Sequence, residues 1–219
     1  MTDDATKARE ARSQLARRLD REHGPFDPSH LDAIIAVDRA RFVRAGDEDR
    51  STEDIPLPLD DEGLATVSAP HAYLLSFRLL ELTAGDVLVE LGTGTGYGAA
   101  LASHIVGPEG HVISIELAPS LALTARELLA PLPNVTVHER DAISSIDVWD
   151  GAKRVVCTFA VESLPDAWID ALPRGGLLVA PVGPPNREQR LLRVRKLDDG
   201  PRVTDHGAVR YVPNRANAP

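Results

Sequence analysis

A glycine-rich run between an apolar segment and a helical segment is the part of this sequence best suited to hold a nucleotide-like ligand. Residues 90–97 read Glu-Leu-Gly-Thr-Gly-Thr-Gly-Tyr and directly follow the apolar residues 87–89. Glycines at such a turn reach positive φ angles and let the backbone approach a ligand closely. Because open α/β sheets bind ligands outside the carboxyl ends of their strands, the run predicts a cofactor site. Its candidate residues are Glu90, Gly92, Thr93, Gly94, Thr95 and Gly96.

Two acidic residues follow the next two apolar segments. Glu116 comes after residues 111–115 and lies 24 positions beyond Gly92 (116 − 92 = 24). A carboxylate at this place can accept hydrogen bonds from both hydroxyls of a ribose. Asp141, after residues 135–139, resembles in position the acidic residue with which class I methyltransferases bind the adenine amino group. Taken alone, Asp141 is equally suited to cap a helix or a turn.

The glycine pattern also admits another ligand. Counted from Gly92, the third small residue of a dinucleotide-binding loop falls on Tyr97, which does not fit. Counted from Gly94, the pattern is complete through Ala99. A nicotinamide or flavin enzyme is therefore the competing interpretation, and a glycine-rich turn without a ligand is the purely structural one.

The segments around these residues alternate between strand and helix patterns. Apolar runs predict strands at residues 87–89, 111–115, 135–137, 155–157 and 177–179, with helices at residues 97–106, 119–132 and 166–172. Such alternation predicts an α/β fold, a Rossmann-like, doubly wound and mostly parallel sheet with helices on both faces. Residues 191–212 have strand-like runs without helices, which predicts antiparallel strands at the edge of the sheet.

The first 70 residues have a different pattern. Helices are predicted at residues 5–23 and 27–37, separated by Gly24-Pro25, and a polar loop is predicted at residues 46–63. A third helix is predicted from Pro70, a residue type that suits a first helical turn, to Gly85. We expect an N-terminal helical and substrate-loop extension (1–70) followed by a Rossmann-like domain (71–219).

Composition argues against several classes of protein. The 33 acidic and 24 basic residues give a formal charge of −9, so no face for duplex nucleic acid or an anionic membrane is expected. No apolar run reaches the ~18 residues of a membrane span. Cys157, the one cysteine, lies in an apolar run and is expected to be buried. The seven histidines show no metal-ligand spacing, so no metal site is predicted. We expect a cytoplasmic protein, monomeric or weakly self-associating.

Motifs outside the glycine loop resemble one family. Residues 66–71 (Thr-Val-Ser-Ala-Pro-His) are similar to the Thr-Ile-Ser-x-Pro-His signature of protein-L-isoaspartate O-methyltransferases. Residues 209–213 (Val-Arg-Tyr-Val-Pro) are similar to the closing Val-Arg-Phe-Val-Pro of that family. Residues 36–43, 53–59 and 172–183 resemble further segments of it, so the resemblance covers roughly residues 15–213.

The resemblance implies S-adenosylmethionine as methyl donor and S-adenosylhomocysteine as product. The acceptor it implies is a carboxylate of a peptide or protein, with an L-isoaspartyl residue as the best single candidate. It adds Leu117 and Ala142 to the cofactor residues. The substrate residues that it implies are Thr66, Val67, Ser68, His71 and Val212.

The expected chemistry needs no general base. A carboxylate has a reference pKa near 4 and is ionised at neutral pH, so positioning carries the catalysis. Ser68 is the candidate catalytic residue, because its hydroxyl can hydrogen-bond the attacking carboxylate. Its alternative role is to cap the helix that starts at Pro70. His71 is expected to pack or to support the site rather than to react.

The sequence departs from the family where the family binds its peptide. Leu64-Ala65 replaces the usual Gly-Gln, and residues 60–62 (Asp-Asp-Glu) lengthen the loop and add negative charge, which predicts a preference for basic peptides. A tailoring methyltransferase that acts on an aspartyl, isoaspartyl or C-terminal carboxylate of a ribosomally made peptide is therefore the alternative function. The residues are also compatible, less closely, with a nicotinamide-dependent oxidoreductase or a non-catalytic binding module.

Overall fold

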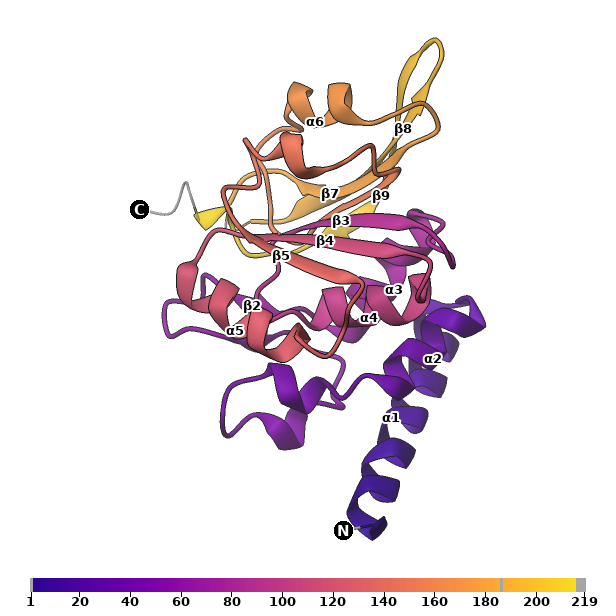
Figure 1. Cartoon of the computed structure of the whole chain (residues 1–219), viewed down its shortest axis with the longest axis vertical. Coiled ribbons are helices and arrows are strands. Elements are labelled where there is room, and N and C mark those ends of the chain that lie inside the picture. Colours follow the sequence, from indigo (N-terminus) through magenta and orange to yellow (C-terminus); the bar gives the residue numbers. More distant parts are fainter. Residues whose placement is uncertain (1, 186, 216–219) are drawn as a thin grey trace.

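A seven-stranded sheet forms the centre of the computed structural model, which describes residues 2–185 and 187–215 (Figure 1). The strand order is β5-β4-β3-β6-β7-β8-β9, in which the first five strands in this order are parallel and β8 and β9 are antiparallel. This arrangement confirms the α/β prediction and the antiparallel edge. The strands are β3 (Val87–Leu91), β4 (His111–Glu116), β5 (Val135–Glu139), β6 (Arg154–Cys157), β7 (Leu177–Val182), β8 (Gln189–Leu197) and β9 (Gly200–Val209).

The strand order reverses at β3. The chain proceeds from β3 outward to β4 and β5, and then returns to place β6 on the other side of β3. Leu91, at the end of β3, therefore pairs with Ile115 of β4 on one side and with Cys157 of β6 on the other. Such a reversal leaves a crevice at the carboxyl ends of the strands, which is where the glycine run begins.

Helices cover both faces of the sheet (Figure 1). Successive side chains of a strand point to opposite faces of the sheet. Leu88 therefore belongs to the hydrophobic cluster on one face, whereas Val89 packs with Trp149 and Trp168 on the other. The first face carries α1 (Thr2–His23), α2 (Pro28–Ala36), α3 (Pro70–Leu79), α4 (Tyr97–Val106) and α5 (Pro119–Leu129). The second carries η3 (Ile146–Val148) and α6 (Asp166–Ala171).

The N-terminal helices share the main hydrophobic core. Leu15 and Leu19 of α1 belong to the same buried cluster as Leu74 of α3 and Leu101 of α4. The division of the chain at residue 70 stays a prediction. Within residues 2–185 and 187–215, no helix is both long enough and apolar enough to cross a membrane.

Several boundaries differ from the sequence prediction by a few residues, most of all the end of the third helix. The helix predicted to reach Gly85 ends at Leu79, because Glu81 turns to a φ of 53° and the amide of Leu82 bonds back to the carbonyl of Phe77 at 3.0 Å. This bond closes a Schellman-type end, with Glu81 in the position that glycine usually takes.

Another difference is in the region expected to be loop. It contains the short turn η2 (Glu48–Arg50) and the strand β1 (Leu57–Pro58), and another short turn, η1 (Arg39–Phe42), precedes it. β1 pairs antiparallel with β2 (Thr66–Val67), Leu57 opposite Val67. This two-stranded sheet gives the segment before α3 a defined shape.

Candidate functional site

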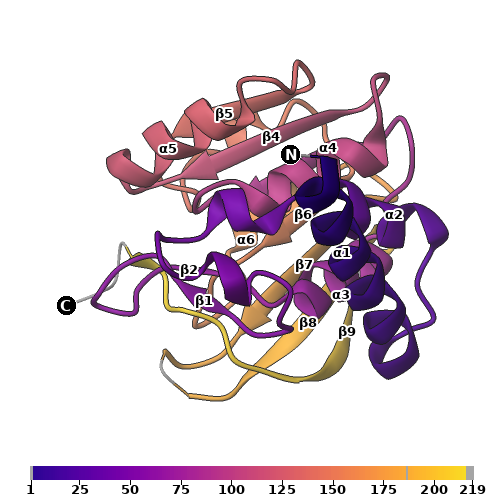
Figure 2. The same ribbon diagram turned by 90° about the horizontal axis from the view of Figure 1, so that it is seen from below.

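Two neighbouring cavities lie where β1 and β2 meet the segment that follows β9. Figure 2 shows this C-terminal segment crossing beside β1 and β2. The two cavities share three wall residues, Thr66, Val212 and Pro213. The first is also lined by Leu64, Ala65, Gly92, Gly94, Ile115, Glu116, Leu117, Leu121, Asp141, Ala142, Thr158, Phe159, Asn214 and Arg215. The second is also lined by Pro56, Gly63, Ser68, Ala69, His71, Ala72, Leu75, Ala208, Val209, Arg210 and Tyr211.

The glycine loop forms the floor of the first cavity. Gly92, Gly94 and Gly96 have φ angles of 97°, 57° and 101°, in the region that favours glycine. A Cβ atom at Gly92 would lie 2.4 Å from Thr158 Oγ1, so even an alanine does not fit there. Gly92 and Gly94 line the cavity, whereas Gly96 begins α4 and packs against Leu129.

Glu116 is held in the cavity wall by backbone amides. Its Oε2 atom accepts a hydrogen bond from the amide of Gly94 at 2.8 Å, and its Oε1 atom accepts one from the amide of Ala118 at 2.9 Å. Burial raises the pKa of Glu116, and these two hydrogen bonds oppose the rise. The carboxylate is thus fixed at the end of β4, with lone pairs left for a ligand.

Glu90 lies beneath the loop rather than in a cavity wall. It is 2% exposed, its Oε2 atom accepts a hydrogen bond from Ser114 Oγ at 2.6 Å, and its Oε1 atom lies 2.1 Å from where a Cβ of Gly98 would be. Burial raises the pKa of Glu90 to about 8, against the hydrogen bond from Ser114 and with a further contribution from Glu116. Its contact with a cofactor stays a prediction, while its role in supporting the loop is visible.

The side chains of the two threonines in the loop form hydrogen bonds with other parts of the protein. Thr93 Oγ1 hydrogen-bonds Ser114 Oγ at 2.6 Å, and Thr95 Oγ1 donates to the carbonyl of Phe42 at 2.6 Å. Thr95 therefore fastens the glycine loop to η1, and neither side chain lines the first cavity.

Asp141 stabilises a turn and also lines the first cavity, and its contact with an adenine stays a prediction. Its Oδ1 atom accepts a hydrogen bond from the amide of Ile143 at 2.9 Å, which stabilises the turn after β5, and the residue also lines the first cavity. Leu117 and Ala142 line the same cavity. Its wall thus offers two carboxylates, Glu116 and Asp141, with apolar side chains between them.

Ser68 lines the second cavity and does not cap α3. The N-cap position is taken by Ala69, without a side-chain hydrogen bond, so the capping alternative is wrong. Burial raises the pKa of the Tyr73 phenol, and hydrogen bonds with the side chain and backbone of Ser68 oppose that rise. Ser68 thus lies beside the buried phenol of Tyr73 at the cavity wall. Thr66, His71 and Val212 also line this cavity, whereas Val67 is buried behind it.

Arg39 shapes the wall of the second cavity from inside the protein. It is 2% exposed, and its guanidinium donates hydrogen bonds to five carbonyl oxygens between residues 51 and 68. The bonds to Ser51 and Ser68, at 3.3 and 3.1 Å, bring the two ends of this segment together. Sequence reasoning did not identify this role, although Arg39 stands in one of the segments that resemble the family.

His71 is held by an acidic partner. Its backbone amide donates to Asp54 Oδ1 at 3.0 Å, and its Nδ1 atom lies 2.9 Å from Asp54 Oδ2. Burial opposes ionisation of Asp54, but the hydrogen bonds from His71 outweigh it and lower the pKa of this carboxyl. His23, at the end of α1, stacks on the ring of His71 and places its Nε2 atom 3.3 Å from the same oxygen.

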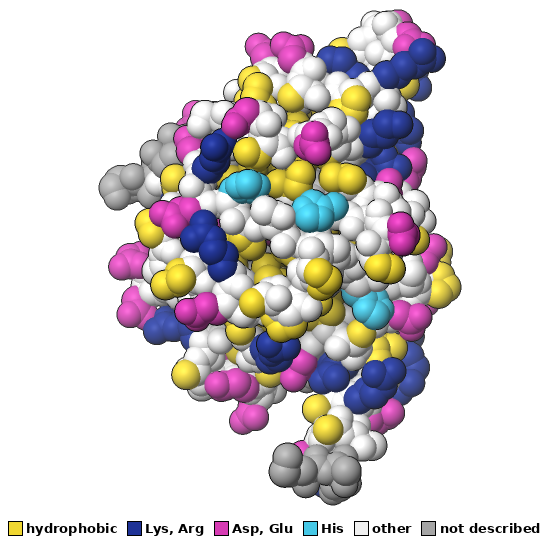
Figure 3. Space-filling model, viewed as in Figure 1, with side chains coloured by type: hydrophobic (Ala, Val, Ile, Leu, Met, Phe, Trp, Pro, Cys, Tyr) yellow, Lys and Arg dark blue, Asp and Glu magenta, His cyan; other side chains and the backbone are white. Residues whose placement is uncertain are grey.

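The acidic loop at residues 60–62 has less unpaired charge than its sequence suggests. Asp60 forms an ion pair with Arg215, and Asp61 forms one with Arg44 at 2.7 Å. Over the face drawn in Figure 3, acidic and basic side chains are interspersed. The expected preference for basic peptides stays a prediction. Because two of the three acidic residues are paired, the loop would favour basic peptides less strongly than its sequence suggests.

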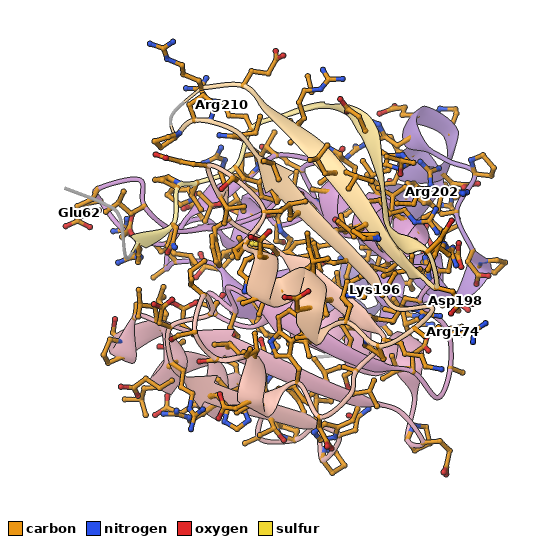
Figure 4. All side chains as sticks on the ribbon, turned by 90° about the horizontal axis from the view of Figure 1, so that it is seen from above. Glu62, Arg174, Lys196, Asp198, Arg202 and Arg210 are labelled. Atoms are coloured by element: carbon orange, nitrogen blue, oxygen red, sulfur yellow. The ribbon has the colours of Figure 1, made fainter. Side chains whose placement is uncertain are left out.

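Several wall residues were not identified from the sequence. Thr158 and Phe159 follow β6, and their place beside β3 at the strand-order reversal is the signal that identifies them. Arg210 lines the second cavity; Figure 4 shows it toward the same end of the molecule as Glu62, away from the hairpin tip marked by Lys196 and Asp198. Of the described residues that line the second cavity, none is Asp or Glu. Cys157 is buried as expected.

Comparison with known proteins gives consistent results. A family model described as protein-L-isoaspartate(D-aspartate) O-methyltransferase matches residues 10–218. The chain is 37% identical over 209 residues to protein-L-isoaspartate O-methyltransferase 2 of Archaeoglobus fulgidus, covering 94% of this chain and 93% of the relative. It is 34% identical over 206 residues to the protein-L-isoaspartate O-methyltransferase of Ignicoccus hospitalis, covering 93% of this chain and 97% of that one.

Solved structures show the same fold. A protein-L-isoaspartate O-methyltransferase superposes with a TM-score of 0.83 at 24% identity, covering 92% of this chain and 65% of the other. A Plasmodium falciparum protein, described as a putative protein-L-isoaspartate O-methyltransferase in complex with S-adenosyl-L-homocysteine, superposes with a TM-score of 0.78 at 19% identity. That superposition covers 94% of this chain and 98% of the other.

Proposed function

Because this chain belongs to the protein-L-isoaspartate O-methyltransferase family, we propose that it transfers a methyl group from S-adenosylmethionine to the carboxylate of an L-isoaspartyl residue in a peptide or protein. The observation that carries the proposal is the junction of the two cavities. They share Thr66, Val212 and Pro213, so a donor in the first cavity and an acceptor in the second meet at one place. The second cavity has Arg210 and His71 in its wall, which suits an anionic acceptor.

The residues of the first cavity fit the proposed donor. Glu116 presents a fixed carboxylate for the ribose hydroxyls, and Asp141 presents one for the adenine amino group. Leu117, Ala142 and Phe159 supply apolar surface on which an adenine ring can pack. Gly92 and Gly94 leave room along the loop for the methionine part.

The reaction needs positioning and no proton transfer. The donor supplies an electrophilic methyl group on a sulfonium; the sulfur–methyl bond breaks as the carboxylate oxygen–methyl bond forms, leaving a methyl ester and S-adenosylhomocysteine. Ser68, in the wall of the second cavity, orients the carboxylate, and the phenol of Tyr73 lies beside Ser68. Arg39 keeps the wall in place. Alignment of this kind is worth ~7–11 kcal/mol of barrier in well-oriented reactions.

The test is a methyl-transfer assay that compares an isoaspartyl peptide with its aspartyl parent. We expect labelled methyl to enter the isoaspartyl peptide and to be released by mild base, as from an ester. Methylation of ordinary aspartate or of a C-terminal carboxylate, with isoaspartate ignored, would instead establish the peptide-tailoring alternative. We further propose a cytoplasmic location and a monomeric or weakly associating state; light scattering at two protein concentrations tests the latter.

A further inference from the structure

Two histidines and an aspartate converge outside the proposed cofactor cavity. The Nδ1 atom of His71 and the Nε2 atom of His23 lie 2.9 and 3.3 Å from the same atom, Asp54 Oδ2. One candidate ligand atom from each residue lies within 4.8 Å of the other two. The three residues come from the end of α1, the segment before β1, and the first turn of α3. They are 31 and 17 positions apart (54 − 23 and 71 − 54), so the spacing of the histidines in the sequence did not reveal them.

The set of donor atoms has the chemistry of a zinc-type site. Imidazole nitrogens and one carboxylate oxygen are ligands that Zn²⁺ accepts, with bonds of ~2.0–2.2 Å. In a tetrahedral site such bonds separate the ligand atoms by about 3.4 Å. The two nitrogen–oxygen separations, 2.9 and 3.3 Å, are near that value, and the ligand atoms of the two histidines lie within 4.8 Å of each other.

The surroundings suit binding from solvent. The side chains of His23 and His71 are 40% and 38% exposed, whereas that of Asp54 is 14% exposed. The second oxygen of Asp54 accepts the backbone amide of His71 at 3.0 Å, which fixes the carboxylate as outer hydrogen bonds do in metal sites. The imidazoles stack with their centroids 4.6 Å apart, so binding requires both rings to rotate until each is coplanar with the metal.

We propose that His23, Asp54 and His71 form a binding site for one divalent transition-metal ion of the zinc type, with a water molecule as fourth ligand. The metal joins the end of α1 to the wall of the second cavity, because the ring of His71 lines that cavity. Occupancy therefore restrains His71 and slows methyl transfer. This last consequence rests on the proposed function, whereas the binding site itself does not.

The test is isothermal titration of the tag-free, metal-stripped protein with Zn²⁺, using Co²⁺ and its visible absorption as a second probe of geometry. We expect one ion per chain, and at least a tenfold weaker affinity in His23→Gln. The matched control is His104→Gln, which removes an exposed histidine of α4 and leaves the affinity unchanged. Asp54→Asn is the second variant, with thermal unfolding to establish that it folds.

Each result decides the proposal. Absence of a one-to-one site in the wild type, or equal affinities in His23→Gln and wild type, would overturn it. The protein could bind one ion, lose affinity in His23→Gln and keep it in His104→Gln, yet methylate no isoaspartyl peptide. That outcome would support the metal site and reject the proposed function. Basal methylation without added metal is expected to be the same in His23→Gln and wild type, while inhibition by Zn²⁺ is lost in the variant.

Discussion

Arg215 forms an ion pair with Asp60, joining the C-terminal segment to the loop that leads into β2. Arg215 also lines the first cavity and acts to lower the pKa of Glu116. The pair is partly shielded, with side chains 29% and 16% exposed, so it contributes more than a fully solvated pair would.

Arg215→Ala is expected to weaken binding of S-adenosylhomocysteine by about threefold to tenfold, because the cavity loses part of its wall and its link to the loop. Titration calorimetry measures the change. Arg44→Ala is the matched control: it removes the more exposed pair with Asp61, and we expect no change in affinity. Equal losses in the two variants would show that general loop stability, rather than the pair at the cavity, is responsible.

Removal of the Glu116 carboxylate tests the assignment of the first cavity. Glu116→Ala should weaken binding of S-adenosylmethionine by ~1–3 kcal/mol, the usual range for a hydrogen bond to a charged group. Glu139→Ala, at the end of the next strand and paired with Arg126 on the surface, is the control that should bind normally. Tight binding of NADH together with no binding of S-adenosylmethionine would reassign the cavity to a dinucleotide.

Glu90 should make stability depend on pH. Its folded-state pKa of about 8 lies above the ordinary value of 4.5, so between these values the folded protein keeps a proton that the unfolded chain has lost. The contribution of Glu90 to the free energy of unfolding is therefore fully present below pH ~4.5. It declines by up to ~1.4 kcal/mol per pH unit as pH rises to ~8.

Glu90→Gln should flatten this part of the profile. Denaturant unfolding at pH 5.5, 6.5 and 7.5, without ligand, measures the free energy of unfolding for both proteins. Other titrating groups affect both proteins alike, so the difference between the two profiles isolates Glu90. Parallel profiles would mean that Glu90 is already ionised in the folded protein.

Ser68→Ala should lower kcat for the isoaspartyl peptide about tenfold, the effect of one orienting hydrogen bond. Tyr73→Phe keeps the buried ring and the hydroxyl of Ser68 but removes the phenol hydroxyl beside Ser68. It therefore measures how much the orientation of Ser68 matters, apart from the presence of its hydroxyl. We expect a smaller loss in Tyr73→Phe. No loss in Ser68→Ala would remove this residue from the catalytic role and leave positioning to the backbone around it.

The sequence was sufficient to predict the features that depend on local patterns. The parallel strands follow from apolar runs, and the glycine loop follows from the ability of glycine to adopt the positive φ angles that such a turn requires. Glu116 could be placed because strand ends of a parallel sheet meet at one edge.

Features that depend on distant contacts could not be predicted. Nothing near Arg39 in the sequence indicates that its side chain is buried against carbonyls up to 29 positions away. The pairing of Asp60 with Arg215 joins residues 155 positions apart, so the loop charge was overestimated. Glu90 belongs to the expected motif, yet strand alternation turns its side chain under the loop, toward Ser114.

The five hydrogen bonds that Arg39 donates to the segment from Ser51 to Ser68 all go to main-chain oxygens. Every residue type provides a carbonyl, so the side chains of this segment can be exchanged without loss of those five bonds. Evolution can therefore vary the surface offered to an incoming peptide while the backbone course is preserved. Leu64-Ala65 and the acidic residues 60–62 lie in this segment, and the same freedom makes the segment a practical place to redesign substrate choice.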